Sequence, residues 1–203
     1  MFAFADNSLA RTPPLYYNNK SLMAFTVEGV PHMFKAVTTL SKRYKDDIRK
    51  LVQASDSEFV PPLSARGSTT QKNLEESAVT DAPTDYFNTL ITQSFILCIK
   101  GFHVVGFLSY IPDHKLEAGD NVNMTCDYIS TIIVDPRHRN HGITTAMYHK
   151  LFAHRPGKIY ATRTWSLNHT HISLLNKLGF SLILTLKDDR GAGVDTVYYS
   201  KGH

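Results

Sequence analysis

The sequence contains little of what marks several large classes of protein. Its 203 residues include two cysteines, Cys98 and Cys126, too few for a disulfide framework, and both lie in apolar, strand-like runs. No segment approaches the roughly 18 consecutive apolar residues of a membrane span, and residues 1–20 lack the apolar core of a signal peptide. We therefore expect a reduced, cytoplasmic chain with no membrane partner.

An excess of charge of one sign is also missing. The 22 Lys and Arg residues stand against 18 Asp and Glu residues, so the net charge is only +4. A dense basic stripe would be expected of a nucleic-acid-binding protein, so nucleic acid is not the expected partner. One segment keeps a nucleic-acid-facing alternative open, because it gathers Lys42, Arg43, Lys45, Arg49 and Lys50.

Metal-ligand spacing is equally absent. His138 and His141 are three residues apart, and His169 and His171 are two apart, but neither pair has a third ligand close in the sequence. Structural zinc sites need four converging ligands and catalytic sites three. We expect no metal.

Hydrophobic periodicity predicts a single α/β domain over residues 33–203, preceded by an N-terminal arm or edge segment over residues 1–32. The expected elements, in order, are a helix over 33–54, a short helix around 70–78, a hairpin over 94–111, a polar loop over 112–123, a strand over 125–134, a helix over 143–153, a strand over 158–165, a helix from 169 that stops at Gly179, and a closing hairpin over 180–200.

The segment over 134–147 joins an apolar strand to a helix through a basic loop that contains Gly142. A helix start presents backbone N–H groups without intrahelical partners and the positive end of the helix dipole, which together attract anions. Gly142 would let a ligand approach the backbone closely, and Arg139 would add positive charge. The loop therefore predicts an anion site.

Three stretches together resemble the GNAT superfamily of acyl-CoA-dependent N-acyltransferases. Residues 139–144, Arg-Asn-His-Gly-Ile-Thr, follow the family's loop pattern, with Thr144 where a Gly or Ala is usual. Asn168 and the Lys-Leu-Gly-Phe sequence over 177–180 resemble a later family motif, and Val-Gly-Phe over 105–107 resembles the hairpin that precedes the central strand. The resemblance spans residues 34–200.

The resemblance implies a mixed, mostly antiparallel, twisted sheet with a splayed central strand pair and helices on both faces. It also implies direct transfer of an acetyl group from acetyl-CoA, the cosubstrate, to a primary amine without a metal, with a homodimer as a possible assembly. Leu175 stands where the family often has a Tyr that acts as the general acid. Leu175 and Thr144 keep a non-catalytic acyl-CoA-binding or sensory domain open as an alternative, and the basic segment over 42–50 keeps open an enzyme acting on aminoacyl-tRNA.

By the same correspondence, the cofactor is expected along the central strand and the loop that follows it. The backbone of the strand would pair with the pantetheine arm, and the loop would hold the diphosphate. The cofactor-binding residues implied are Ile132, Ile133, Val134, Arg139, Asn140, His141, Gly142, Ile143, Thr144, Asn168 and Lys177.

The catalytic candidates lie near the start of the central strand. Tyr128 and Ser130 share one face of that strand and Asp127 takes the other, because successive side chains alternate. Tyr128 is the first choice of base, and Asp127 or Glu58 is the reserve; Tyr128, Ser130, Ser166 and Asn168 are candidate acids. The loop with two prolines after the first helix resembles the family's acceptor-binding region, and offers Glu58, Ser64 and Arg66 to the substrate.

Overall fold

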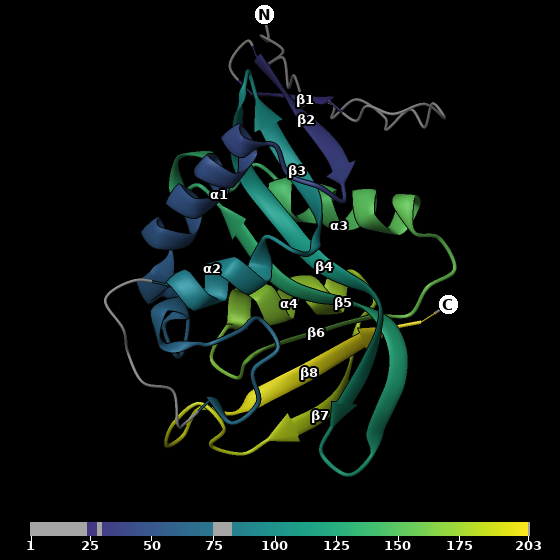
Figure 1. The fold of residues 1–203 in the computed structure, drawn as a ribbon. Coiled ribbons are helices and arrows are strands. Elements are labelled where there is room, and N and C mark those ends of the chain that lie inside the picture. Colours follow the sequence, from purple (N-terminus) through teal and green to yellow (C-terminus); the bar gives the residue numbers. More distant parts are fainter. Residues whose placement is uncertain (1–23, 28–29, 75–82, 203) are drawn as a thin grey trace, which may run out of the picture.

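The computed structural model describes residues 24–27, 30–74 and 83–202. Within them, eight strands form one sheet in the order β1-β2-β3-β4-β5-β6-β8-β7 (Figure 1). The strands are β1 (Ala24–Val27), β2 (Val30–Val37), β3 (Ser94–Lys100), β4 (His103–Ala118), β5 (Val122–Val134), β6 (Tyr160–Trp165), β7 (Ser181–Leu186) and β8 (Thr196–Lys201). All neighbouring pairs are antiparallel except β5 and β6, which run parallel. This is the mixed, mostly antiparallel sheet that the sequence predicts.

The helices cover both faces of the sheet (Figure 1). They are α1 (Lys42–Ala54), α2 (Thr84–Leu90), α3 (Ile143–His154) and α4 (His169–Lys177), with short 3-10 turns η1 (Asp56–Glu58), η2 (Leu63–Ala65) and η4 (Pro136–His138). Alternation along β3 shows the division, because Phe95 and Leu97 pack with α1 and α2 whereas Ile96 and Cys98 pack with α3. The sheet therefore separates two apolar cores.

A β-bulge changes the alternation in the middle of β5. Ser109 of β4 pairs with Thr131, but the next residue, Tyr110, pairs with Ile129, so Ser130 has no partner opposite it. An extra residue of this kind puts two neighbouring side chains on one face. Ser130 Oγ accordingly donates to Gln93 Oε1 at 2.6 Å, and the Thr131 hydroxyl bonds the Tyr86 hydroxyl of α2 at 2.6 Å. Both hydroxyls thus face the α1–α2 side.

The pairing between β5 and β6 ends next to this bulge. Their parallel pairing covers only residues 127–129 of β5 and 160–162 of β6, and Thr162 Oγ1 closes it by donating to the carbonyl of Ile129 at 2.9 Å. Further along, β5 pairs only with β4, and β6 pairs only with β8. The central pair is therefore splayed as predicted, and within the described residues no strand lies beside one edge of β5 over residues 130–134.

The predicted helix over 33–54 is wrong in its first part. Residues 30–37 form strand β2, which pairs with both β1 and β3, and α1 begins only at Lys42, where Ser41 Oγ accepts from the amide of Tyr44 at 3.3 Å. Phe34 and Val37 fit a helical period, yet in a paired strand the same segment satisfies its backbone groups through β3. Tertiary pairing decides the outcome.

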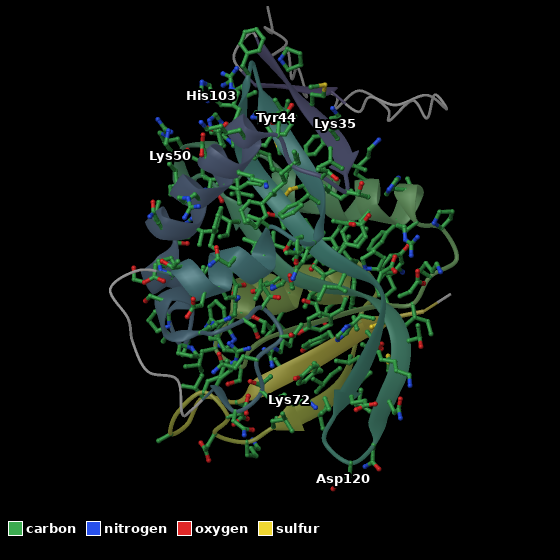
Figure 2. All side chains as sticks on the ribbon, in the orientation of Figure 1. Lys35, Tyr44, Lys50, Lys72, His103 and Asp120 are labelled. Atoms are coloured by element: carbon green, nitrogen blue, oxygen red, sulfur yellow. The ribbon has the colours of Figure 1, made fainter. Side chains whose placement is uncertain are left out.

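Of two further predictions between α1 and β5, one is untested in its larger part and the other is wrong. In the expected short helix around 70–78, residues 70–73 form turns and bends, Leu74 is in a 3-10 turn, and residues 75–78 lie outside the described part; α2 begins at Thr84. The expected polar loop over 112–123 is largely strand, because β4 and β5 stay paired as far as Ala118 and Val122. Leu116, Ala118 and Val122 are buried there, and Asp120 marks the hairpin tip (Figure 2).

The remaining predicted elements are confirmed. The first hairpin, the central strand, α3, β6, α4 and the closing hairpin all form where the sequence predicts them. Cys98 and Cys126 are buried and free, and burial raises the pKa of each thiol to about 12. No helix within the described ranges is long and apolar enough to cross a membrane.

Candidate active site

The loop after β5 leads into helix α3, whose start has no side-chain cap. Asn140 and Gly142 both have left-handed backbone conformations, with φ of 64° and 71°, and α3 begins at Ile143. Helices α1 and α4 each have a side-chain cap, from Ser41 and Asn168, whereas the N-cap of α3 is Gly142 and no side chain caps it. The first amides of α3 are thus available to an anion.

The space in front of Gly142 is open. A Cβ added at this position would meet no heavy atom within 4 Å, and the positive φ favours glycine. His141 is exposed beside it, and Thr144 is partly buried. An anionic group of the size of a phosphate can therefore reach the backbone, and the residues present fit the diphosphate of coenzyme A.

Arg139 joins this loop to the strand end and to the acceptor loop. Its Nε donates to the carbonyl of Val134 at 2.9 Å, and its Nη2 donates to both carboxylate oxygens of Glu58 at 2.9 and 2.8 Å. A residue predicted to bind the cofactor is thus paired with one predicted to bind the acceptor. Both side chains are more than a third exposed.

The strand residues predicted to lie along the cofactor offer backbone groups. Ile133 and Val134 are buried, Ile132 is partly buried against the core, and Ile143 is buried within it. Since β6 has already left β5 at this level, the backbone edge at 130–134 is the part of the strand that a ligand could address.

The later motif is divided between the two ends of α4. Asn168 caps the helix, since its Oδ1 accepts from the amide of His171 at 3.3 Å while its Nδ2 donates to Thr164 Oγ1 at 3.0 Å. Lys177 is exposed in the last turn, about 13 Å further along at 1.5 Å per residue. The structure therefore does not bring these two predicted cofactor residues together.

Tyr128 is the most enclosed of the catalytic candidates that face α1 and α2. It is 2 % exposed, and burial raises the pKa of its phenol to about 12. Its hydroxyl makes no hydrogen bond with the residues that the structure describes, although the atom is not completely shielded from solvent. A hydroxyl that keeps solvent access in an otherwise enclosed place, and has no hydrogen bond with described residues, is available to a ligand.

Asp127 lies on the opposite face, as alternation predicts. It is fully buried, and its oxygens accept from Arg155 Nε at 2.8 Å, from Arg155 Nη2 at 3.0 Å and from the amide of Asp113 at 3.0 Å. These bonds tie the end of α3 to the sheet. The geometry gives Asp127 a structural role.

The other candidate acids are also engaged elsewhere. Ser166 Oγ accepts from the amide of Asp195 at 3.1 Å, and Leu175, at the family's Tyr position, is completely buried in the core under α4. Ser130 belongs to a chain of polar groups that includes Ser109, 2.9 Å away, and Gln93. Of the sequence candidates, Tyr128 and Ser130 are the ones that the structure brings together on the splayed side.

The acceptor loop is held by its own polar side chains. Ser64 donates through its amide and its hydroxyl to Asp56 at 2.6 and 2.9 Å. Arg66 is 8 % exposed and donates to the carbonyl of Pro61 at 2.7 and 3.1 Å and to that of Val60 at 3.2 Å. Arg66 thus points inward, under the loop.

Two arginines that the sequence reasoning missed lie beside Arg66. Arg163 of β6 donates to the Tyr198 hydroxyl at 3.2 Å and to the carbonyl of Gln71 at 2.5 Å. Arg190, between β7 and β8, donates to Thr196 Oγ1 at 2.8 Å and to the carbonyl of Val60. An arginine in the middle of a strand, flanked by threonines, was the signal available for Arg163.

The paired histidines do not form a metal site with the described residues. Over residues 24–27, 30–74 and 83–202, no group of three His, Cys, Asp or Glu side chains converges as a metal site would require. His171, one of the paired histidines, bonds the hydroxyl of Tyr148 at 2.9 Å instead.

Three solved structures similar to this one are N-acetyltransferases. An N-acetyltransferase from Staphylococcus aureus Mu50 is 14 % identical, with 84 % of this chain and 98 % of that chain covered and a TM-score of 0.58. An aminoglycoside 6'-N-acetyltransferase in complex with coenzyme A is 16 % identical (83 % and 96 % covered, TM-score 0.58). A ribosomal-protein-alanine N-acetyltransferase from Brucella melitensis is 15 % identical (84 % and 99 % covered, TM-score 0.56). Identities this low show a common fold.

Sequence comparison carries the relationship further. A search of curated proteins finds no match. A family model described as the acetyltransferase (GNAT) family, however, matches residues 65–180, more than half of the chain, from Arg66 and its neighbours through the α3 loop to Phe180. The chain therefore belongs to the GNAT acetyltransferase family.

Proposed function

We propose that this protein transfers an acetyl group from acetyl-CoA directly to the primary amine of an acceptor. The observation that carries the proposal is the uncapped start of α3 at Gly142, which follows a strand that has parted from its neighbour. Membership of the acetyltransferase family supports it, and one similar structure contains coenzyme A.

The residues around the α3 start have separate parts in holding the cosubstrate. The amides of Ile143 and Thr144, with the loop over 140–142, take the diphosphate, and Arg139 adds positive charge. The backbone of residues 132–134 pairs with the pantetheine arm. Acetyl-CoA, when bound, supplies an activated thioester carbonyl.

Tyr128 is better suited to giving a proton than to removing one. A phenol with a pKa near 12 stays protonated at neutral pH, so it donates a hydrogen bond or a proton to the reacting group. Ser130, in contact with Ser109 and Gln93, can orient an amine or a water on the same face. Asp127, bonded to Arg155, takes no part in this proposal.

The test is a panel of primary amines, with release of free coenzyme A as the measurement. At least one class of amine should accelerate thiol release well above the rate without acceptor. If acetyl-CoA binds but no amine accelerates the release of free coenzyme A, the non-catalytic acyl-CoA-binding alternative is correct.

Tyr128→Phe sharpens the test. It should lower kcat by about 100-fold, the usual scale of a proton-transferring group, and leave acetyl-CoA affinity unchanged. Tyr44→Phe is the matched control, because Tyr44 lies on α1 away from this site (Figure 2). An unchanged kcat in Tyr128→Phe would remove Tyr128 from the reaction.

A further inference from the structure

Three arginines from distant parts of the sequence meet on the splayed side of the sheet. Arg66 follows η2, Arg163 lies on β6, and Arg190 lies in the β7–β8 connection; we call them the arginine cluster. Arg66 and Arg190 are 8 % and 7 % exposed, and Arg163 is partly buried. Three cations are thus largely withdrawn from water in one region.

Every hydrogen-bond partner that the described residues offer to the cluster is neutral. Arg66 contacts backbone carbonyls, Arg163 contacts a carbonyl and a phenol, and Arg190 contacts a carbonyl and a hydroxyl. Within the described ranges, no carboxylate lies within ion-pair distance of any of the three. Each guanidinium also keeps one nitrogen without a hydrogen bond to described residues: Nη1 of Arg66, Nε of Arg163 and Nη2 of Arg190.

Tyr128 lies close enough to all three arginines to interact with them electrostatically. Arg66, Arg163, Arg190 and Tyr128 act on one another electrostatically in every pairwise combination. Burial lowers the pKa of Arg66, and burial together with Arg66 and Arg163 lowers the pKa of Arg190 to about 9. Tyr128, whose hydroxyl makes no hydrogen bond with described residues, therefore lies within electrostatic range of all three guanidinium groups.

Two carboxylates lie near enough to act on the cluster, but both have other partners. Asp56 accepts from Ser64, and Asp189 accepts from the hydroxyl of Thr196 at 2.6 Å. Among the described residues, three positive charges thus stand against two negative charges that contact none of them. Buried charges are normally paired, and leaving them unpaired is costly.

Guanidinium groups match the geometry of carboxylate and phosphoryl oxygens, which they bind through two parallel hydrogen bonds. Aromatic rings complete the surroundings: Arg66 lies 5.6 Å from the ring centroid of Phe59, and Arg190 lies 6.0 Å from that of Trp165. Rings of this kind exclude water and strengthen a charge pair formed between them. A cationic group on a ligand, by contrast, would be repelled by the three arginines.

We infer that the acceptor amine carries a compact anionic group, a carboxylate or a phosphoryl group, which the arginine cluster binds beside Tyr128. The amine part of this inference rests on the proposed function, whereas the binding of the anion does not. Acceptors with several amines and no acid group are excluded as good substrates.

The first test compares matched amines on the wild-type protein with coenzyme A present, so that the α3 start is already filled. β-Alanine is paired with β-alaninamide, and 2-aminoethylphosphonate with propylamine, in calorimetric titrations and in assays of coenzyme A release. The acidic member of at least one pair should bind at least about 10-fold more tightly, the usual strength of a charge-assisted bond. The two pairs distinguish carboxylate from phosphoryl recognition.

The second test uses Arg163→Gln, with Arg43→Gln as control, because Arg43 is exposed on α1 and its replacement changes the net charge equally. Arg163→Gln should weaken binding of the acidic amine about 10- to 100-fold, and Arg43→Gln should not. Equal binding of acidic and neutral amines, or unchanged binding in Arg163→Gln, would overturn the inference.

The two proposals fail separately. If coenzyme A gives no binding signal, the proposed function is wrong, while the titrations of acidic amines still decide whether the cluster binds anions. If coenzyme A binds and amines react without preference for an acid group, only the inference is wrong. Should Arg163→Gln not fold, the matched amines on the wild type decide alone.

Discussion

The polar groups on the two sides of β5 differ in how completely they are paired. On the α3–α4 side, Arg155 bonds two carboxylates, of Asp127 and Asp113, and the Tyr148 hydroxyl bonds His171. On the α1–α2 side, the described residues offer the arginine cluster only neutral acceptors, and none of them forms a hydrogen bond with the Tyr128 hydroxyl. Complete pairing is what a structural role requires, and incomplete pairing is what a ligand can complete.

The largest effect is expected from breaking the complete pairing. Arg155→Met leaves the carboxylate of Asp127 fully buried without its cationic partner, and should cost about 3 kcal/mol of unfolding free energy. Thermal unfolding should then occur roughly 6 to 12 °C lower. The double variant Asp127→Asn with Arg155→Met should regain part of this loss, because it buries no charge. A single variant as stable as the wild type would contradict the structural role of the pair.

The next effect concerns His171 and pH. Burial lowers the pKa of His171 to about 4, against about 6.5 in an unfolded chain. Between these values the unfolded chain binds more protons, so the unfolding free energy should fall by about 1 to 2 kcal/mol from pH 7 to pH 5. Chemical denaturation at both pH values measures it. Residue 171 cannot titrate in His171→Gln, so the unfolding free energy of this variant should fall less. An identical fall would mean that another group takes up the proton.

A smaller effect on stability is expected on the α1–α2 side. Arg163→Gln loses hydrogen bonds to Tyr198 and Gln71 but relieves repulsion from Arg66 and Arg190, so its unfolding free energy should change by less than about 1.5 kcal/mol. Urea unfolding, run beside Arg155→Met, gives the comparison. A loss as large as that of Arg155→Met would mean that the cluster is a clamp for the loop.

The smallest effect is expected where pairing is complete but exposed. Glu58→Gln removes the ion pair with Arg139, which as a solvent-exposed pair contributes at most about 1 kcal/mol to stability. It also frees Arg139 for a phosphate, so coenzyme A should bind about 2- to 5-fold more tightly in a calorimetric titration. Weaker binding would show that Glu58 helps to hold the cofactor site together.

The sequence predicted the parts of the fold that depend on local pattern. The β-branched run of β5, the helix start after Gly142 and the stop of α4 at Gly179 all carry short-range signals. Strand β2 was mistaken for the start of a helix because Phe34 fits either period, and only pairing with β3 decides between them. The bulge at Ser130 likewise depends on the partner strand and leaves no mark in β5 alone.

The candidate site likewise has one part that the sequence predicts and one part that it does not. The uncapped helix start follows from Gly142 and the residues around it, which are contiguous. The arginine cluster does not, because Arg66 and Arg190 are 124 positions apart in number and Arg163 reads as an ordinary solvated charge. Only the placement of β6 beside β5, and of β8 beside β6, brings these side chains under the loop that contains Arg66.

The most direct test of the account is the shift in melting temperature caused by acetyl-CoA in the wild type and in Gly142→Asp. A ligand at 100 times its Kd stabilises the native state by about 2.7 kcal/mol, which should raise the wild-type melting temperature by roughly 5 to 10 °C. Gly142→Asp sets a carboxylate against the phosphates and should show no shift. Gly157→Asp is the control, since Gly157 has a similar φ of 74° and equally open space, and it should keep the full shift. A full shift in Gly142→Asp would contradict the anion site at the start of α3 and, with it, the proposed acetyl transfer.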